Sequence, residues 1–313
     1  MSEPPSPSTA QNRPRAAALA LVVTFLWSTS WVLIRRGLDD EDLPPITFAG
    51  LRYALAAVLL VAWTASGPRR AELRTLERRT LGPLVALGVV MYAITQGAQF
   101  VAIEAQPFAT TNLMLAMTPL VVALTAATFV GETTTIVQRI GGLVIVAGVV
   151  AYFRGDLGAT RVGMTAATIG LIANAASVFL GRSINRATAL SSRLVTTVSM
   201  SVGAVLLLST GLVIDGVPRL GWVAVVIIVW LAAVNTAVAF TWWNQSQRVL
   251  SATETAAINT AMAVQIPIFG WIFFDEALGP AEVAGITLVV LGVLAMRSTQ
   301  RRAAPPAVAE TVS

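Results

Sequence analysis

Polar and aromatic side chains recur at helical spacing inside long apolar segments of this sequence, where their chemistry is open to a ligand. Tyr92, Thr95, Gln96 and Gln99 stand at i, i+3, i+4 and i+7, so a helix would place them in one continuous stripe. In lipid, such a stripe faces partner helices or a water-filled path. Because amide and hydroxyl groups bind small polar molecules by hydrogen bonds, the stripe predicts part of a substrate-binding surface.

Other apolar segments carry further side chains of the same kinds. Trp27, Ser30 and Trp31 repeat the stripe in the first segment, and their indole rings suit an apolar group or a cation. The other predicted substrate-binding residues are Thr111, Asn174, Asn235, Trp243, Asn259 and Gln265. Hydrogen bonding between helices is the competing interpretation, and it is favoured for the serine and threonine positions. The two interpretations stay balanced for Gln96, Gln99, Asn174 and Asn259.

The composition is that of an integral membrane protein. Hydrophobic residues make up 56% and charged residues 12% of the chain, against roughly 25% charged residues in soluble proteins, and the mean hydropathy is +0.75. The absence of cysteine and histidine excludes disulfides, metal sites built from those residues, and serine–histidine or cysteine–histidine nucleophiles. No nucleotide-binding loop or other catalytic motif is present. We therefore expect no enzyme, no cofactor and no metal.

Ten apolar runs are close in length to a bilayer core and predict an all-α protein with ten transmembrane helices. Strands are excluded because the runs are too long and too evenly apolar for a membrane barrel. Residues 1–15 and 298–313 lack an apolar period and are predicted to be disordered cytoplasmic tails. The apolar runs are 16–34, 46–65, 81–101, 109–130, 136–153, 163–181, 194–214, 221–241, 255–274 and 281–296.

The stretch Ala109–Phe153 is written a second time as Thr253–Arg297, so that Gly141 corresponds to Gly285 at a shift of 144 residues. Each copy has an apolar helix, a turn that contains a glutamate, and a second helix with spaced glycines. Ten spans in two copies give five spans per copy, and an odd number forces the second copy to be inverted. Inverted repeats are typical of secondary transporters that bind substrate between the two halves. The predicted repeats are residues 16–153 and 163–297.

The arginines indicate which ends of the spans face the cytoplasm. All basic residues are arginines, and most fall in the loops on the side of the two termini. We therefore expect both termini to be cytoplasmic and the protein to lie in the inner or plasma membrane. This distribution is a topology signal and predicts no nucleic-acid partner. The arginines on the opposite side are Arg35, Arg36, Arg154, Arg161 and Arg219.

Charged residues within or next to the spans have competing interpretations. Arg52 lies inside the second span, where a charge is costly and a functional role is the default, with snorkelling to the outer interface as the alternative. Glu132 and Glu276 are duplicated by the repeat, and capping of the helix that follows each explains them better than proton coupling. The first span has no carboxylate, while Glu104 and Glu254 stand only at span edges. This pattern disfavours a proton antiporter of cations.

Two prolines fall inside predicted spans. Pro119 and Pro267 each remove a backbone hydrogen bond and tend to kink a helix. In a carrier such kinks are natural hinges, and static kinks that aid packing are the alternative.

Four segments, in their order along the chain, form a recognisable pattern together with the ten spans and the repeat. They are Trp27–Trp31, Pro45–Arg52, Pro119–Glu132, and Phe273–Glu276 followed by Gly285 and Gly292. The pattern covers nearly all of Ala16–Met296 and resembles the EamA family of the drug/metabolite transporter superfamily. The resemblance implies an inner-membrane carrier that exports amino acids or related small molecules. It also favours a structural role for Arg52, and it is broken at Ala263, where the shift would place a proline.

Together these observations predict a secondary transporter without cofactors that moves small polar metabolites, above all amino acids or derivatives, outward by alternating access. Its partners would be the small-molecule substrate and the lipid bilayer, and the oligomeric state is left open, a monomer included. The alternatives are a proton-coupled multidrug or cation exporter, a carrier that flips lipid-linked sugars, and a non-transporting membrane sensor or assembly protein.

Overall fold

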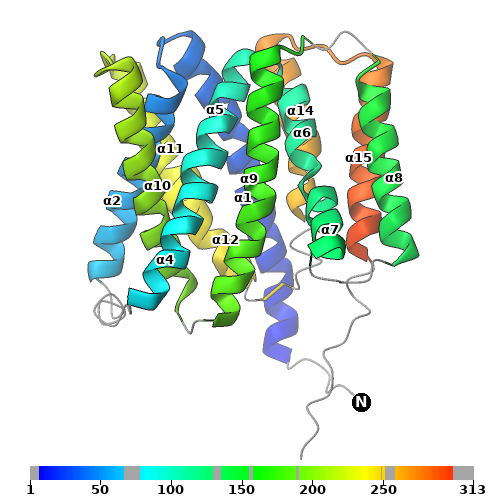
Figure 1. Cartoon of the computed structure of the whole chain (residues 1–313), viewed down its shortest axis with the longest axis horizontal. Coiled ribbons are helices and arrows are strands. Elements are labelled where there is room, and N and C mark those ends of the chain that lie inside the picture. The colour runs from blue at the N-terminus through cyan, green and yellow to red at the C-terminus, as the bar shows by residue number, and fades with distance from the viewer. Residues whose placement is uncertain are drawn as a thin grey trace, which may run out of the picture.

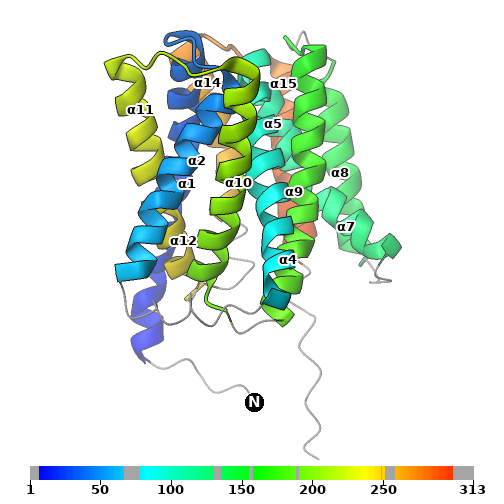
Figure 2. The ribbon, with the colours of Figure 1, turned by 60° about the vertical axis from the view of Figure 1, so that its left-hand side comes forward.

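The computed structural model describes residues 7–66, 78–129, 135–154, 158–187, 190–247, 249–250 and 258–298. Every regular element within these ranges is a helix, and the helices stand side by side in one bundle (Figures 1 and 2). Seven helices are long and apolar enough to cross a membrane, and three shorter apolar helices lie beside them. The predicted all-helical membrane fold with ten spans is therefore confirmed. The shorter helices are Ile136–Tyr152, Ile258–Phe274 and Pro280–Met296.

Both halves of the chain contain the same series of elements. The first half consists of α1 (Pro7–Asp39), α2 (Pro45–Ser66), the run of α4 (Arg78–Leu87), η1 (Gly88–Ile94) and α5 (Thr95–Ala105), the pair α6 (Phe108–Ala116) and α7 (Thr118–Phe129), and α8 (Ile136–Tyr152). The second half consists of α9 (Arg161–Ala187), α10 (Ser192–Asp215), the run of α11 (Trp222–Ala232), η2 (Ala233–Val238) and α12 (Ala239–Gln247), then α14 (Met262–Phe274) and α15 (Pro280–Ser298).

The two halves enter the bundle from opposite ends. Arg35, near the end of α1, donates a hydrogen bond of 3.0 Å to the backbone carbonyl of Glu104. Thr160, just before α9, donates one of 2.9 Å to the neighbouring carbonyl of Ala105. Helix α9 therefore begins where α1 finishes, which confirms that the second repeat is inverted. We call this end of the molecule, at the top of Figure 1, the Arg35 end.

Helix pairing follows the approximate two-fold symmetry that the repeat implies. α2 packs against its counterpart α10, and α8 packs against its counterpart α15. The pairs α5–α9 and α12–α1 are equivalent to each other, because the shift turns α5 into α12 and α1 into α9. In Figure 2, α2 and α10 lie side by side at the front of the molecule.

Duplicated glycines allow α8 and α15 to approach closely. A Cβ atom on Gly148 would lie 2.8 Å from the carbonyl oxygen of Gly285, and one on Gly292 would lie 2.6 Å from that of Gly141. Each contact thus joins a glycine of one copy to a glycine of the other, Gly148 to Gly285 and Gly141 to Gly292, so the two contacts are related to each other by the repeat. Small residues at a helix interface let two backbones pack directly in lipid. The spaced glycines of the repeat therefore hold its two copies together.

The proline-containing spans are broken at equivalent positions, Met117 and Ala261, which differ by the same 144 residues. At each break the backbone forms a tighter turn, since the N–H of Met117 bonds to Met114 at 3.2 Å and that of Ala261 to Ile258 at 3.0 Å. The breaks lie at equivalent positions in the two repeats, although Pro119 and Pro267 do not. The predicted single span 109–130 is therefore two helices, α6 and α7.

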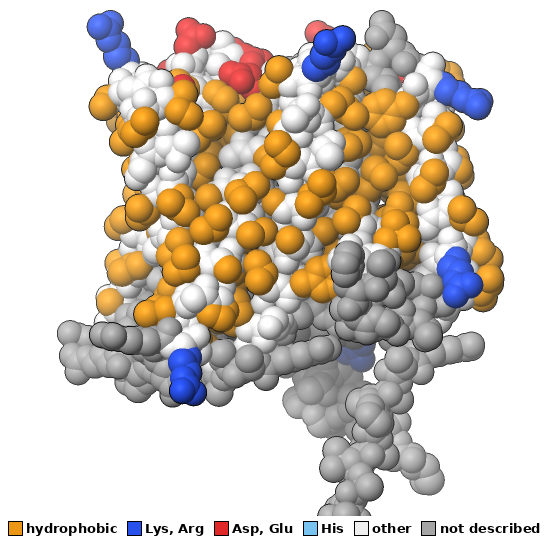
Figure 3. Space-filling view, viewed as in Figure 1, with side chains coloured by type: hydrophobic (Ala, Val, Ile, Leu, Met, Phe, Trp, Pro, Cys, Tyr) orange, Lys and Arg blue, Asp and Glu red, His pale blue; other side chains and the backbone are white. Residues whose placement is uncertain are grey.

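The surface of the molecule has the distribution of side chains that a membrane protein needs. Hydrophobic side chains cover the middle of the face shown in Figure 3, and the charged side chains gather toward its two ends, as a bilayer requires.

Helix α1 begins at Pro7, within the segment 1–15 that was predicted to be disordered. A long apolar helix can extend its first turns into water because each added residue gains a backbone hydrogen bond.

Candidate functional site

A cavity of about 750 Å³ lies inside the bundle between the two repeats. The first half of the chain contributes residues of α1, α2, η1, α5 and α6 to its wall. The second half contributes residues of α9 and α12, together with Asn259 and Met262. Its volume is in the range of small-molecule sites, about 300–1,000 Å³. We call this space the central cavity.

The central cavity brings together most of the residues that the polar stripes single out. Aromatic rings and uncharged amides form most of its wall, so it can offer hydrogen bonds at fixed places and apolar surface between them. The predicted substrate-binding residues that line it are Trp27, Ser30, Trp31, Gln96, Gln99, Asn174, Trp243 and Asn259.

Four predicted residues are not among those that line the central cavity, because each is engaged in helix packing. Tyr92 is buried against Gly203 of α10. Thr111 donates to the carbonyl of Ala102 at 3.2 Å. Asn235 donates to the carbonyl of Leu26 in α1. Gln265 accepts a hydrogen bond of 2.8 Å from Ser28 of α1.

Several cavity side chains are held in place by neighbours. The hydroxyl of Tyr53 donates to Oε1 of Gln96 at 2.6 Å, and Nδ2 of Asn174 donates to the hydroxyl of Thr118 at 3.1 Å. The π-helices η1 and η2 occupy equivalent positions in the repeats, and η1 contributes Met91 to the cavity wall. Single π-helical turns are frequent at functional sites because they turn side chains away from the regular helical face.

Arg52 does not snorkel to an interface, which corrects one interpretation of the sequence. Its side chain is only 5% exposed and lines the central cavity. The Nε atom donates to the hydroxyl of Thr236 at 3.1 Å. The guanidinium also lies against the rings of Tyr53 and Phe100, so the charge stays inside the bundle.

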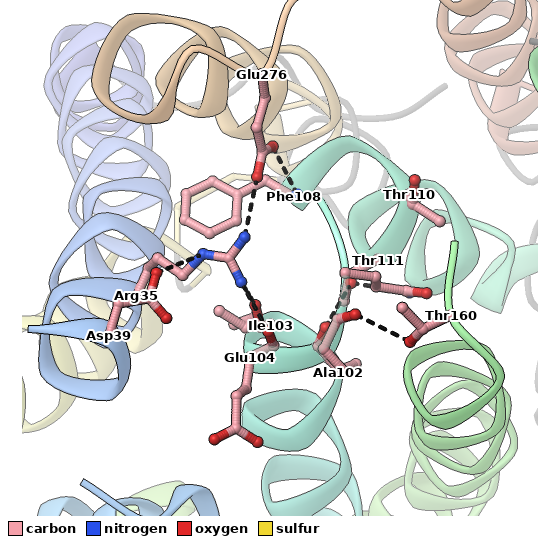
Figure 4. Close-up of polar contacts among 12 residues, drawn as sticks. Arg35, Asp39, Ala102, Ile103, Glu104, Phe108, Thr110, Thr111, Thr160 and Glu276 are labelled. Atoms are coloured by element: carbon pink, nitrogen blue, oxygen red, sulfur yellow. Dashed lines mark hydrogen bonds and ion pairs between the residues drawn. The ribbon is translucent and has the colours of Figure 1, made fainter. Parts of the chain in front are cut away.

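Arg35 closes the bundle on one side of the central cavity (Figure 4). Its guanidinium donates to the carbonyls of Ile103 and Glu104 at the end of α5. It also forms ion pairs with Asp39 at 3.3 Å and with Glu276 at 3.4 Å. Because α1 and α5 belong to the first repeat and Glu276 to the second, this cluster links the two halves of the molecule. We call it the Arg35 closure.

Glu276 caps a helix, but a different one from the helix predicted. Its Oε2 atom accepts a hydrogen bond of 2.7 Å from the backbone N–H of Phe108, at the first turn of α6 in the other repeat. The left-handed Asp275 (φ 52°) reverses the chain and directs the carboxylate back over Gly270, which leaves room for it. Burial raises the pKa of Glu276, and the Phe108 N–H and the Arg35 guanidinium counteract that effect. Glu132 and Glu254 lie outside the described residues.

Stacked aromatic rings connect the Arg35 closure with the central cavity. The guanidinium of Arg35 lies 5.6 Å from the ring centroid of Phe108, and this ring packs edge-on against Trp31 at 5.7 Å. Phe274, next to the Glu276 turn, packs on the other side of Phe108 at 5.2 Å. Trp31 lines the cavity, so the Arg35 closure lies next to the cavity, on the side of the Arg35 end.

The role of Arg35 was not predicted from the sequence, although a signal for it is present there. Trp27, Trp31, Arg35 and Asp39 stand four residues apart, so they continue one helical face from the cavity to the closure. The arginine distribution assigned Arg35 to a loop, and this assignment does not show the shared helical face. The partner Glu276 was recognised through the repeat, but contact between the two was not predictable from either position.

A second cavity, of about 670 Å³, has a different character. It lies between α2, α5, α9 and α10, and its wall is apolar apart from Arg161, Thr165 and Thr210. Exposed side chains such as Ile169 and Leu206 border it on the outside of the bundle. A polar substrate finds few partners there, so the central cavity is the candidate functional site. Among the described residues, no group of three or more potential metal ligands is gathered.

An inverted five-plus-five helical repeat with a polar cavity between the halves is typical of membrane transporters. The chain belongs to the EamA-like transporter family, whose model matches residues 14–154 and 161–298. It therefore belongs to a family of transporters, not of enzymes, within the drug/metabolite transporter superfamily.

Two relatives match this chain over most of its length. A probable terminal-alkyne amino-acid exporter of Streptantibioticus cattleyicolor is 25% identical, over 89% of this chain and 92% of the relative. An S-adenosylmethionine/S-adenosylhomocysteine transporter of Chlamydia trachomatis is 24% identical, over 88% of this chain and 87% of the relative. A solved structure described as the crystal structure of a protein superposes with a TM-score of 0.63 over 93% of this chain and all of the other, at 19% identity, and shows the fold alone.

Proposed function

We propose that the protein is a secondary transporter that moves amino acids or amino-acid derivatives by alternating access. The observation that carries this proposal is the central cavity of about 750 Å³, lined by amides and aromatic rings, at the boundary between the inverted repeats. Amides suit the polar end of an amino acid, and Trp27, Trp243 and Phe240 suit its side chain. The relatives described as an amino-acid exporter and as an S-adenosylmethionine transporter support the same class of substrate.

We further propose that the two termini are cytoplasmic and that the Arg35 end faces the opposite, outer side of the membrane. Net transport is then directed outward. The excess of arginines in the loops on the side of the termini supports this orientation. The described structure then has its outer side closed by the Arg35 closure. Export requires that this cluster opens while the opposite end closes.

The cavity wall favours a facilitator or exchanger over a proton-coupled exporter of cations. No carboxylate is found among the described residues that line it, and cationic drugs are bound most strongly by a buried carboxylate. Glu276 lies in the closure, on the far side of Phe108 from the cavity. A multidrug exporter remains the alternative that the experiment must test.

The test is transport into proteoliposomes that contain the purified full chain. Vesicles preloaded with unlabelled amino acid are given labelled phenylalanine, methionine or leucine, and parallel vesicles are given labelled S-adenosylmethionine, a nucleoside or a cationic dye. Each is measured with and without an imposed pH gradient. Saturable counterflow of an amino acid or of S-adenosylmethionine that ignores the gradient is the expected result. Empty vesicles serve as the control.

Two other results would contradict the proposal in different ways. Dye uptake that depends on the pH gradient, without amino-acid counterflow, would identify a proton-coupled exporter. Binding of an amino acid to the purified protein without any flux would identify a sensor that uses the same fold.

A further inference from the structure

A buried cation stands in the wall of the central cavity. Arg52, on α2, is 5% exposed and is the arginine among the described residues that line this cavity. Its neighbours in the wall are uncharged, and they include Tyr53, Gln96 and Gln99. A charge inside a membrane protein is costly and marks a functional site by default.

The described protein groups satisfy only part of the Arg52 guanidinium. Nε donates to the hydroxyl of Thr236, and the rings of Tyr53 and Phe100 lie 5.2 and 5.9 Å from the guanidinium carbon. Across the described residues, no carboxylate forms an ion pair with Arg52 and neither Nη atom has a hydrogen-bond acceptor. The contacts hold the plane of the guanidinium and leave its two-pronged end open to the cavity.

Arg35 shows how this protein pairs an arginine whose partners are all protein groups. Two carboxylates, Asp39 and Glu276, pair with Arg35, and two carbonyls accept its protons. Arg52 is more deeply buried than Arg35 and has one neutral acceptor. An unpaired buried charge is strongly destabilising unless an anion joins it. Arg52 is therefore suited to bind an anion, and the cavity that it lines is the space from which one can arrive.

We propose that the Nη atoms of Arg52 bind the carboxylate of the transported substrate. A guanidinium recognises a carboxylate with two parallel hydrogen bonds, which fixes its orientation as well as its charge. The amide oxygens of Gln99, Asn174 and Asn259 then remain for a substrate ammonium group, and the indoles of Trp27 and Trp243 for its side chain. This inference rests on the proposed function and narrows its substrates to molecules with a free carboxylate.

Thr236 acts as a positioning residue for Arg52. It lies in η2, donates its own hydroxyl proton to the carbonyl of Leu231 at 2.8 Å, and so offers its lone pairs to Nε of Arg52. The hydroxyl of Thr236 thus lies between that carbonyl and the arginine. Replacing Thr236 with valine keeps the shape and the charge of Arg52 but removes this support.

The first test uses the unaltered protein and pairs of ligands that differ only in the carboxylate. Phenylalanine, methionine and leucine are compared with phenylalaninol, methioninol and leucinol, and 3-phenylpropionate tests a carboxylate without an ammonium group. Binding is followed by thermal stabilisation of the purified protein, and transport by competition with labelled amino acid. Each amino acid is expected to bind about 10- to 100-fold more tightly than its amino alcohol, the range for a charge-assisted hydrogen-bond pair.

The second test changes the arginine. Arg52→Gln and Arg52→Lys are expected to lose the preference for the carboxylate, because lysine keeps the charge but not the two-pronged geometry. Thr236→Val is expected to weaken amino-acid binding by a smaller factor and to leave binding of the amino alcohols unchanged. Arg219→Gln, which removes an exposed arginine, is the matched control and should behave as the unaltered protein. The ligand pairs decide the question even if the Arg52 variants fail to fold.

The outcomes separate this inference from the proposed function. Equal binding of amino acids and amino alcohols to the unaltered protein, or a carboxylate preference that survives in Arg52→Gln, would overturn the role of Arg52 while flux continues. Carboxylate-dependent stabilisation that is lost in Arg52→Gln, without flux in vesicles, would support the binding role and refute transport. Neither binding nor flux with any of these compounds would refute both.

Discussion

At the scale of residues, Glu276 is the group on which the closed state depends most directly. Its two carboxylate oxygens serve two different donors, the backbone N–H of Phe108 and the guanidinium of Arg35. One donor comes from α6 and the other from α1, while Glu276 belongs to the second repeat. A carboxylate that joins two elements of the opposite repeat stabilises their contact in a way that a surface ion pair cannot.

Glu276→Gln should destabilise the closed protein by about 1–3 kcal/mol. Glutamine offers one acceptor oxygen, so its amide N–H₂ must face either the Phe108 N–H or Arg35, donor against donor, whereas a protonated glutamate keeps acceptor lone pairs on both oxygens. The melting temperature of the purified variant measures the effect, with Asp40→Asn as the control because that carboxylate is half-exposed at the same end. An unchanged melting temperature together with lost proton coupling would instead make Glu276 a coupling residue.

The stability of the protein should also depend on the protonation of Glu276. Its pKa is raised from the ordinary 4.5, chiefly by burial, so the folded protein holds this proton more tightly than the unfolded chain. The resulting stability is fully present below pH 4.5 and is lost as the pH rises through the raised pKa. The melting temperature of the unaltered protein should therefore rise relative to that of Glu276→Gln as the pH falls from 7. A difference that is independent of pH would contradict this account.

The sequence could predict which residues are polar within the spans but not which neighbours they find. The stripe at Gln96 and Gln99 and the tryptophans of the first span do line the central cavity. Gln265 is equally polar and equally placed in a span, yet Ser28 occupies its oxygen. Only the relative rotation of α1 and α14 decides between these outcomes, and rotation depends on packing that no single helix encodes.

At the scale of elements, both prolines free a carbonyl that another side chain satisfies. The missing N–H of Pro119 would have bonded to Leu115, whose carbonyl instead accepts from the hydroxyl of Thr118 at 2.6 Å. That of Pro267 would have bonded to Ala263, whose carbonyl accepts from Asn112 of the other repeat at 3.2 Å. The breaks of the two spans are thus supported from outside the backbone, as transmembrane prolines require.

A double-mutant cycle can measure the support of the second proline. Asn112→Ala alone should cost about 1–3 kcal/mol because it leaves the Ala263 carbonyl buried and unpaired. In Pro267→Ala the restored N–H can bond to that carbonyl, so the same asparagine change should cost less. Melting temperatures of the four proteins give the interaction energy, expected at about 0.5–3 kcal/mol. Strictly additive effects would show that the two groups do not act on one carbonyl.

The glycine contacts between α8 and α15 predict a second effect at this scale. Gly148→Ala would place a Cβ atom 2.8 Å from the Gly285 carbonyl and force the helices apart, at a cost of about 1–3 kcal/mol. Gly181→Ala is the matched control, because no heavy atom lies within 4 Å of the added Cβ. Thermal melting should therefore separate the two variants. Equal stability would mean that the α8–α15 contact is looser than described.

At the scale of the whole molecule, the repeat predicted the architecture and the local sequence did not predict its irregularities. The shift of 144 residues correctly indicated ten spans in two inverted halves, because it reflects the symmetry of the fold. The equivalent breaks at Met117 and Ala261 could not be predicted from the prolines, because Pro119 and Pro267 do not occupy equivalent positions in the two copies. The π-helices η1 and η2 share no proline or glycine at equivalent positions, and each packs against helices of the other half, η1 against α9 and α10 and η2 against α1 and α2.

The most direct test of alternating access is the sidedness of chemical labelling at the central cavity. The chain has no cysteine, so Ser30→Cys creates a single thiol in the cavity wall. A membrane-impermeant maleimide is applied to one side or the other of oriented proteoliposomes, with and without phenylalanine. Labelling from each side, slowed by substrate, and faster from the Arg35 end in Glu276→Gln, is the predicted result. Labelling from one side only, in both the Ser30→Cys protein and its Glu276→Gln form, would contradict alternating access through this cavity.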